Sequence, residues 1–175
     1  MQNDDNKNII LTGFMATGKT SVGRILASQL GYELVDTDQL IESRIGMTIA
    51  ELFQEQGEAA FRKMESDLAR ELADKSGLVI ATGGRFMLVG DNANILGKTG
   101  RVFCLVATPE EILKRAEIDS NVRPLLQVSN PLEHIVQLLQ ERKAGYRQFP
   151  QFVTSGKSPE TIAEDLLEII AGSRV

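Results

Sequence analysis

Short apolar runs alternate along the chain with longer segments in which apolar and polar residues recur at helical spacing. This alternation is typical of βαβ units, which build a parallel sheet covered by helices. The apolar runs predict strands at Asn8–Thr12, Glu33–Val35, Leu78–Ala81, Arg101–Val106 and Gln151–Val153. The amphipathic segments predict helices at Lys19–Leu30, Gln39–Arg44, Thr48–Gln56, Glu58–Lys75, Pro109–Ala116, Pro131–Phe149 and Pro159–Ala171. We therefore expect a three-layer α/β/α fold with a five-stranded parallel sheet.

The ends of several predicted helices carry residues that are favoured at helix caps. Thr108, Asn130 and Ser158 each precede a proline, and such residues are preferred N-caps before a proline in the first turn. Gly31 follows the first predicted helix, where a C-terminal cap glycine is common. These signals place the helix ends independently of the hydrophobic pattern.

The chain shows no repeat and no linker rich in Gly, Pro and Ser, and 175 residues suit one domain. We therefore expect a single domain over residues 1–175. One region, Glu117–Asn130, combines charge with little periodicity. Irregular segments of this kind often close over an active site, so we expect a mobile lid at about residues 117–130.

The formal net charge of −5 argues against nucleic-acid binding through a basic face. No apolar stretch is long enough for a transmembrane helix, and the polar start Met1–Lys7 lacks the pattern of a signal peptide. The single cysteine, Cys104, lies in an apolar run, which indicates a buried, inert thiol and fits a reducing compartment. We expect a cytoplasmic protein that binds neither nucleic acid nor membranes.

A glycine-rich run, Gly13-Phe-Met-Ala-Thr-Gly18-Lys19-Thr20, follows the first predicted strand and opens a predicted helix. It matches the phosphate-binding pattern Gly-x-x-x-x-Gly-Lys-[Ser/Thr] at every position. The glycines let successive backbone N–H groups face phosphates, and the helix N-terminus adds its dipole. Lys19 can reach the outer phosphates, and the Thr20 hydroxyl can bind Mg²⁺. The run predicts an ATP-binding phosphotransferase; the alternative is a glycine-rich turn without a ligand.

Two aspartates follow the second predicted strand, in Val35-Asp36-Thr37-Asp38. Residues two apart on an extended chain point the same way, so both carboxylates can face a cleft beyond the strand end. One carboxylate can hold the water shell of Mg²⁺ while the other orients or deprotonates a substrate hydroxyl. The alternative is that Thr37 or Asp38 only caps the following helix. Spacing alone leaves both possibilities open.

From the phosphate loop onward, the chain resembles the shikimate kinases. The similarity runs from about Asn8 to Ile170, with the motifs in family order and at family-like intervals. The motifs are Gly13-Phe-Met-Ala-Thr-Gly-Lys-Thr-Ser-Val-Gly-Arg24, Asp36-Thr-Asp38, Gly46-Met-Thr-Ile-Ala-Glu-Leu-Phe53, Gly57-Glu-Ala-Ala-Phe-Arg-Lys-Met-Glu65, Gly83-Gly84, Arg123-Pro-Leu-Leu126 and Arg142-x-x-x-Tyr146.

The resemblance implies a P-loop kinase that transfers phosphate from ATP, with Mg²⁺, to the 3-hydroxyl of shikimate in aromatic amino-acid synthesis. It also implies a monomer and a helical acceptor-binding segment at about residues 36–65. Catalytic roles are implied for Lys19, for Asp38 as the base and for Arg123 as the lid arginine. Thr20 would bind the metal directly and Asp36 through water.

The remaining implied site residues fall into two groups. The acceptor would contact Asp38, the backbone of Gly83 and Gly84, and the two arginines that grip its carboxylate, Arg62 and Arg142. Paired guanidinium groups suit a small carboxylic acid because they bind a planar carboxylate in a bidentate fork. The nucleotide would contact Gly13, Ala16, Thr17, Gly18, Lys19, Thr20, Ser21, Arg115, Arg123 and Pro159.

Local chemistry offers other roles for the three acceptor and lid arginines. Arg62 lies four residues after Glu58 and three before Glu65, which is ideal for ion pairs on a helix surface. Arg142 can belong to ordinary helix-surface packing, and Arg123 precedes a proline as an extended loop residue does.

The chain departs from the family pattern at Arg85, which stands where the family has a third glycine after Gly83-Gly84. An arginine there would be strained if the position needs a positive φ; alternatively, its side chain swings aside or adds a third cation to the acid site. At the adenine end, Ala116 replaces a frequent family arginine, with Arg115 adjacent. A family aspartate is also absent from the later loop Val153–Pro159.

These departures keep two further functions open. One is a kinase of another small polyhydroxy acid, such as quinate or gluconate. The other is a nucleotide-binding regulator that has lost turnover. The presence of acceptor and lid residues argues against the regulator, since such a protein needs neither.

Overall fold

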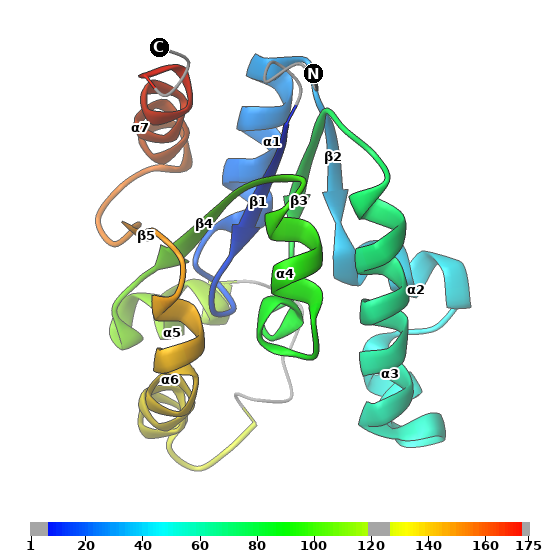
Figure 1. The fold of residues 1–175 in the computed structure, drawn as a ribbon. Coiled ribbons are helices and arrows are strands. Elements are labelled where there is room, and N and C mark those ends of the chain that lie inside the picture. Colours follow the sequence, from blue (N-terminus) through cyan, green and yellow to red (C-terminus); the bar gives the residue numbers. More distant parts are fainter. Residues whose placement is uncertain (1–6, 119–126, 173–175) are drawn as a thin grey trace.

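The computed structural model describes residues 7–118 and 127–172. Its centre is a five-stranded sheet in the order β2-β3-β1-β4-β5, and every neighbouring pair is parallel (Figure 1). The strands are β1 (Asn8–Thr12), β2 (Glu33–Asp36), β3 (Leu78–Ala81), β4 (Gly100–Val106) and β5 (Gln151–Val153). The predicted α/β class and parallel sheet are confirmed.

Helices cover both faces of the sheet. The helix α1 (Lys19–Leu30) packs with α7 (Pro159–Gly172) on one face. On the other face lie α2 (Thr37–Ile45), α3 (Ile49–Ala73) and α4 (Asn92–Gly97). The remaining helices, α5 (Pro109–Ile118) and α6 (Pro131–Arg147), pack together near the ends of β4 and β5 (Figure 1).

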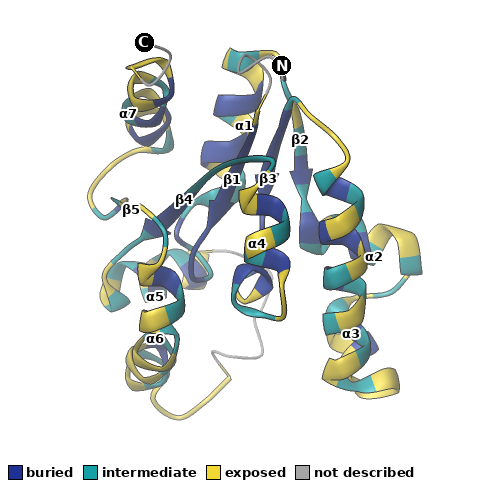
Figure 2. Ribbon diagram, in the orientation of Figure 1, coloured by how far each residue is buried: buried dark blue, intermediate teal, exposed yellow. Residues whose placement is uncertain are grey.

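Alternation along β1 explains the two hydrophobic layers. Ile9 and Leu11 pack against α1 and α7, whereas Ile10 packs against the α2, α3 and α4 side. Successive strand residues point to opposite faces, and a sheet covered on both faces buries every residue. All five residues of β1 are accordingly buried, and β1 and β3 are uniformly dark in Figure 2.

The helices around α3 match the sequence expectation, whereas α4 does not. Residues Ile49–Ala73 consist of two helical stretches that meet at a kink at Gly57, where φ is 80° and ψ is 169°, in agreement with the two predicted helices. The kink requires glycine, because only glycine adopts such angles freely. The short helix α4 was not predicted. Its six residues are fewer than two turns, too short to display a helical period.

Asn8, the first residue of β1, ties the loop between α3 and β3 to the sheet. Its side chain is fully buried, its Nδ2 donates to the Lys75 carbonyl at 2.8 Å, and its Oδ1 accepts from the Leu78 N–H at 3.0 Å. The amide therefore fixes the end of α3 against the start of β3. A buried polar group that loses its partner costs about 1–3 kcal/mol.

We expect Asn8→Ala to lower the free energy of unfolding by about 2–3 kcal/mol, because two buried backbone groups lose their partner. Urea denaturation of Asn8→Ala and of the control Asn94→Ala measures the effect. Asn94 is exposed and bonds only locally, to Asp91, so its replacement should change stability by less than about 0.5 kcal/mol. Equal effects of the two substitutions would contradict the structural role of Asn8.

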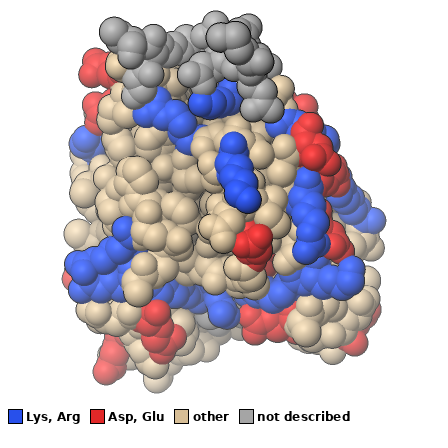
Figure 3. Space-filling model, in the orientation of Figure 1, with Lys and Arg blue, Asp and Glu red and all other residues tan. Residues whose placement is uncertain are grey.

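Charged side chains of both signs alternate along the exposed side of α3, at the right of Figure 3. The ion pairs include Lys63–Asp67 at 2.6 Å and Arg70–Asp67 at 3.1 Å.

Within the described residues, none of the helices has the length and apolar character needed to span a bilayer.

Candidate active site

The phosphate loop joins β1 to α1 and has the backbone that its glycines predict. Gly13 has φ 133°, and a Cβ there would overlap the Leu105 carbonyl oxygen. Gly18 has φ 98° and is the N-cap of α1. Both angles are in the region that disfavours side chains. The loop therefore needs glycine at these two positions, and Ala16, at φ 56°, also takes left-handed angles.

Polar side chains inside the loop hold its shape. The buried Thr17 donates its hydroxyl to the Phe14 carbonyl at 2.8 Å. The Lys19 ammonium donates to the carbonyls of Gly13 at 2.9 Å and Phe14 at 2.7 Å. Lys19 thus projects back over the loop from the first residue of α1, and the exposed Ser21 lies in the same first turn. A cation over backbone N–H groups at a helix N-terminus suits a polyphosphate.

Thr20 and Asp36 meet at the carboxyl edge of the sheet. The Thr20 hydroxyl donates to Asp36 Oδ2 at 2.7 Å, and Asp36 Oδ1 accepts from the Gln39 N–H at 3.2 Å. Asp36 is therefore the N-cap of α2, and the alternative that Thr37 or Asp38 fills this role is wrong. Because Asp36 lies at the end of an extended strand, its side chain can reach back over the new helix. Two adjacent oxygen donors fit a hard cation such as Mg²⁺.

Asp38 lies against the turn that follows β3. A Cβ on Gly83 would overlap Asp38 Oδ1 and lie 3.1 Å from its Cγ. The Gly83 N–H donates to the buried Thr37 hydroxyl at 2.9 Å. The turn and the start of α2 are thus locked together, and the missing side chain at position 83 makes room for the Asp38 carboxylate.

We expect Gly83→Ala to lower kcat about 100-fold, because the added Cβ displaces Asp38 and misplacement near 1 Å has that typical cost. Stability should change little, since a flexible side-chain end moves aside. Steady-state kinetics and thermal melting check both expectations. Gly97→Ala is the matched control, because a Cβ at Gly97 meets no atom within 4 Å. A fall in Tm without loss of kcat would contradict this account.

Arg62 makes both of the helix ion pairs that its spacing predicts. Its Nε and Nη2 donate to Glu58 Oε1 at 3.0 and 2.9 Å, and its Nη1 donates to Glu65 Oε2 at 2.7 Å. Its side chain is 19% exposed. The local interpretation is therefore correct as geometry, and it leaves the acceptor role of Arg62 as a prediction.

Glu65 is a further candidate site residue, for which the sequence spacing predicts only an ion pair with Arg62. Its side chain is 1% exposed, and its Oε1 has no hydrogen-bond partner among the described residues. Burial raises the pKa of Glu65 to about 7, although Arg62 opposes the shift; the nearby charge of Asp38 raises it further. Glu65 thus links Arg62 to Asp38. The signal in the sequence was the spacing of three residues from Arg62, which does not reveal burial.

Arg142 faces the phosphate loop from α6. Its guanidinium lies 5.2 Å from the Phe14 ring centroid, within the range of a cation–π contact. One turn later, the buried Tyr146 donates its hydroxyl to the Gly84 carbonyl at 2.5 Å, and burial raises the pKa of Tyr146 to about 12. A Cβ on Gly84 would lie 3.8 Å from Arg142 Nη1. These contacts place Arg142 beside the loop and Gly84, beyond simple surface packing.

Arg85 has ordinary backbone angles, with φ −111° and ψ −1°. The strain expected for a residue in a glycine-only conformation is therefore absent. Its side chain is 45% exposed and turns toward α3, where Nη1 lies 3.0 Å from Glu58 Oε1. Arg85 thus swings aside and also brings a third guanidinium to the acid side of the site.

Arg115 joins three segments around the loop. Its guanidinium donates to the Thr154 carbonyl at 2.8 Å, the Thr154 hydroxyl at 3.0 Å and the Ala16 carbonyl at 3.4 Å. These contacts fix the phosphate loop to the loop before α7, which begins at Pro159. Arg115 thus contacts Thr154 at the start of that loop, and Pro159 follows its end. Arg123, the expected lid arginine, and most of the expected lid lie outside the described residues.

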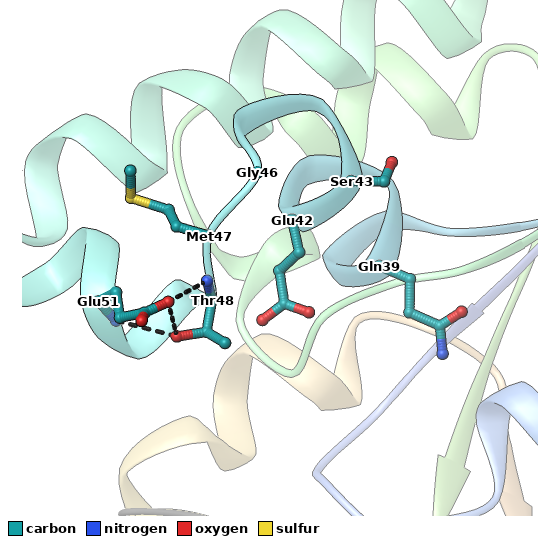
Figure 4. A pocket seen from close by; sticks show the side chains of 7 residues that line it. All are labelled: Gln39, Glu42, Ser43, Gly46, Met47, Thr48 and Glu51. Atoms are coloured by element: carbon teal, nitrogen blue, oxygen red, sulfur yellow. Dashed lines mark hydrogen bonds between the residues drawn. The ribbon is translucent and has the colours of Figure 1, made fainter.

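A shallow hollow lies elsewhere, between the end of α2 and the start of α3 (Figure 4). Its polar groups already cap α3: Thr48 and Glu51 bond each other, and Glu42 accepts from the Ile49 N–H at 2.9 Å. None of the individually named site residues lines it, although its lining residues, from Gln39 to Glu51, all lie within the expected acceptor-binding segment at about residues 36–65.

Cys104 is fully buried, and burial raises the pKa of its thiol to about 11. Both observations agree with the expected inert cysteine.

Known proteins are similar to this chain in sequence and in fold. The shikimate kinase family model matches residues 15–171. A shikimate kinase from Thermodesulfovibrio yellowstonii is 44% identical over 163 residues, covering 93% of this chain and 94% of the relative. The solved shikimate kinase from Acinetobacter baumannii in complex with shikimate is 36% identical, with a TM-score of 0.89, covering 97% of this chain and 95% of that chain.

A gluconokinase from Sinorhizobium meliloti has a TM-score of 0.59 at 16% identity, a likeness that shows the fold alone. The family match, by contrast, spans nearly the whole chain. It includes the phosphate loop from Met15 onward, Asp38 in α2, the Gly83-Gly84 turn and α6. The chain therefore belongs to the shikimate kinase family, whose enzymes use ATP to phosphorylate shikimate.

Proposed function

We propose that this enzyme transfers the γ-phosphoryl group of ATP to the 3-hydroxyl of shikimate through the residues described above. The observation that carries the proposal is the position of Asp38. Its carboxylate lies against Gly83, on the same sheet edge as the phosphate loop, and Glu65 connects it electrostatically to Arg62. Donor and acceptor groups at one sheet edge are what a direct transfer requires.

The donor half is the phosphate loop. Backbone N–H groups from Gly13 to Thr20 and the N-terminus of α1 would hold the phosphates of ATP. Lys19 would balance the charge on the outer phosphates, where phosphoryl transfer spreads negative charge over the equatorial oxygens. Arg115 supports this half by fixing the loop through the Ala16 carbonyl.

Mg²⁺ would be held by Thr20 and, through water, by Asp36. The residues fit the ion, because a hydroxyl and a carboxylate oxygen lie 2.7 Å apart at the loop, and Mg²⁺ prefers oxygen donors. When bound, the ion neutralises phosphate charge. Thr20 and Asp36 would orient the phosphates toward the side where Asp38 lies.

The acceptor half begins at Asp38, which would accept the proton of the 3-hydroxyl of shikimate. At the same time the hydroxyl oxygen would bond to the γ-phosphorus, and the bond between the γ-phosphorus and ADP would break. Arg62 and Arg142 would bind the shikimate carboxylate in bidentate fashion. The backbone of Gly83 and Gly84 would lie beside the ring, and Arg123 would close over the phosphates. Closure would also exclude water from the phosphoryl group.

Arg85 motivated the alternative of a different polyhydroxy acid, such as quinate or gluconate. Its ordinary φ removes the strain argument for that alternative, and its side chain pairs with Glu58 of α3. Shikimate is therefore the acceptor we propose. We also propose that the enzyme acts as a cytoplasmic monomer.

The product tests the proposal directly. After incubation with ATP, Mg²⁺ and shikimate, phosphorus and proton NMR should find one new ester, with the phosphate on the 3-hydroxyl. Omission of Mg²⁺ should stop the reaction. Phosphate on another hydroxyl would contradict the role of Asp38, and undiminished turnover in a chelator would contradict the roles of Thr20 and Asp36.

A further inference from the structure

A single carboxylate oxygen at the acceptor side serves two guanidinium groups. Glu58 Oε1 accepts from Arg62 Nε at 3.0 Å and Arg62 Nη2 at 2.9 Å, and also from Arg85 Nη1 at 3.0 Å. Arg62 belongs to α3, whereas Arg85 follows the Gly83-Gly84 turn. Both arginines therefore donate to the same carboxylate oxygen of Glu58, one from α3 and the other from the residue after the turn.

Three of the five N–H groups of Arg62 are engaged by its own chain. Nε and Nη2 bond to Glu58, and Nη1 bonds to Glu65. An incoming carboxylate that takes the Nε–Nη2 side of Arg62 must displace Glu58 from it. The side chain of Glu58 is 51% exposed, so the loss of Arg62 costs about fivefold or less in an equilibrium constant, which is about 1 kcal/mol or less. A second positive partner reduces that cost.

Arg85 is that partner. Hydrogen bonding from Arg62 lowers the pKa of Glu58, and the charges of Arg62, Arg85 and Arg142 act in the same direction. The fields of all three guanidinium groups thus converge on Glu58. The charges of Arg62 and Arg85 also act on Glu65. The chain therefore carries an additional positive charge where an anionic acceptor would enter.

We propose that Arg85 is a positioning residue of the acceptor site, which holds Glu58 so that the Arg62 guanidinium can turn to the carboxylate of the acceptor. The inference rests on the proposed function, because Arg62 is taken as a carboxylate-binding residue. Arg85 acts through Glu58 and touches neither the phosphates nor the reacting hydroxyl. Its effect therefore belongs to acceptor binding, and to acceptors that carry a carboxylate.

Steady-state kinetics of Arg85→Gln and Arg85→Lys test the proposal. Arg85→Gln should raise KM for shikimate about three- to fivefold, the scale of a half-exposed charge pair, and leave kcat within about twofold. Arg85→Lys should restore KM to within about twofold of the parent enzyme, because the cation is retained. The methyl ester of shikimate, which has no carboxylate charge, should show no change of KM in either variant.

Two controls sharpen the result. Arg70→Gln removes an exposed arginine of α3 that pairs with Asp67, and it should leave both KM values unchanged. In the Glu58→Gln background, Arg85→Gln should have no further effect on KM, because the group that Arg85 holds is gone.

Three results would overturn the inference: an unchanged or lowered KM for shikimate in Arg85→Gln, an equal rise for the acid and its ester, or a loss confined to kcat. These outcomes presuppose that the parent enzyme phosphorylates shikimate and therefore leave the proposed function standing. A parent enzyme that binds ATP but does not phosphorylate shikimate would overturn both.

Discussion

Replacement of Asp38 by Asn is expected to lower kcat about 1,000-fold while leaving the dissociation constant of ATP within about twofold. A positioned general base contributes about 10²–10⁴ to the rate, and an amide cannot accept the hydroxyl proton at neutral pH. Asp38 lies against Gly83, whereas the carboxylate that bonds to Thr20 of the phosphate loop belongs to Asp36. Its removal should therefore spare the donor half.

Single-turnover kinetics and nucleotide titration separate the two quantities for Asp38→Asn. Asp74→Asn serves as the control, since Asp74 is exposed at the end of α3 and should leave kcat unchanged. Loss of ATP affinity in step with kcat would place Asp38 on the nucleotide side. Retention of kcat within about fivefold would show that the transfer needs no base there.

Lys19→Met is expected to lower kcat/KM for ATP by about 10²–10³-fold, because one cation that stabilises transition-state charge is lost. Its ammonium lies 2.9 Å from the Gly13 carbonyl and 2.7 Å from the Phe14 carbonyl, directly over the phosphate loop. Shikimate affinity, measured by equilibrium titration, should remain within about threefold, since the Lys19 ammonium bonds to the backbone of the phosphate loop, the half of the site proposed to hold ATP.

The matched control is Lys63→Met, which removes an exposed lysine, 77% accessible, from the surface of α3. It should leave both kinetic constants and shikimate affinity unchanged. If Lys19→Met kept its activity toward ATP while losing shikimate, the assignment of the loop to the donor would be wrong.

The fold was largely predictable because its signals are local. β1, β3 and β5 have the predicted bounds. β1 and β3 are fully buried, and such strands appear as short apolar runs between turn residues. Asn130 caps α6 and Gly31 ends α1 at φ 69°, as their residue types predict. The break at Gly57 within α3 falls between the two predicted helices, whereas α4 was not predicted because it is too short to show a helical period.

The candidate site also combines features that local sequence predicts with features that depend on the tertiary structure. The phosphate loop is contiguous, so its glycines and Lys19 could be assigned from spacing. The contact between Asp38 and Gly83 joins residues that are distant in sequence, and only the sheet order brings them together. Arg62 shows the limit most clearly, because its helix ion pairs were predictable whereas its burial beside Glu65 depends on tertiary packing.

Position 85 shows a second limit. The family pattern has glycine there, and a sequence alone does not show which backbone angles a turn adopts. The observed φ of −111° allows any L-residue, so the arginine costs no backbone strain. Its partner, Glu58, lies on a helix that precedes it in the sequence by 27 residues, and no local pattern links the two.

The most direct measurement is ADP release by the purified enzyme, coupled to an optical assay, with shikimate, quinate and gluconate offered in parallel. The account predicts saturable release with shikimate, and a kcat/KM for shikimate at least about 100-fold above the other two acids, a ratio worth about 2.7 kcal/mol in transition-state binding. Preference for quinate or gluconate would contradict the assigned acceptor. Tight ATP binding without ADP release in the presence of any of the three acids would contradict the conclusion that the protein is a kinase of such acids.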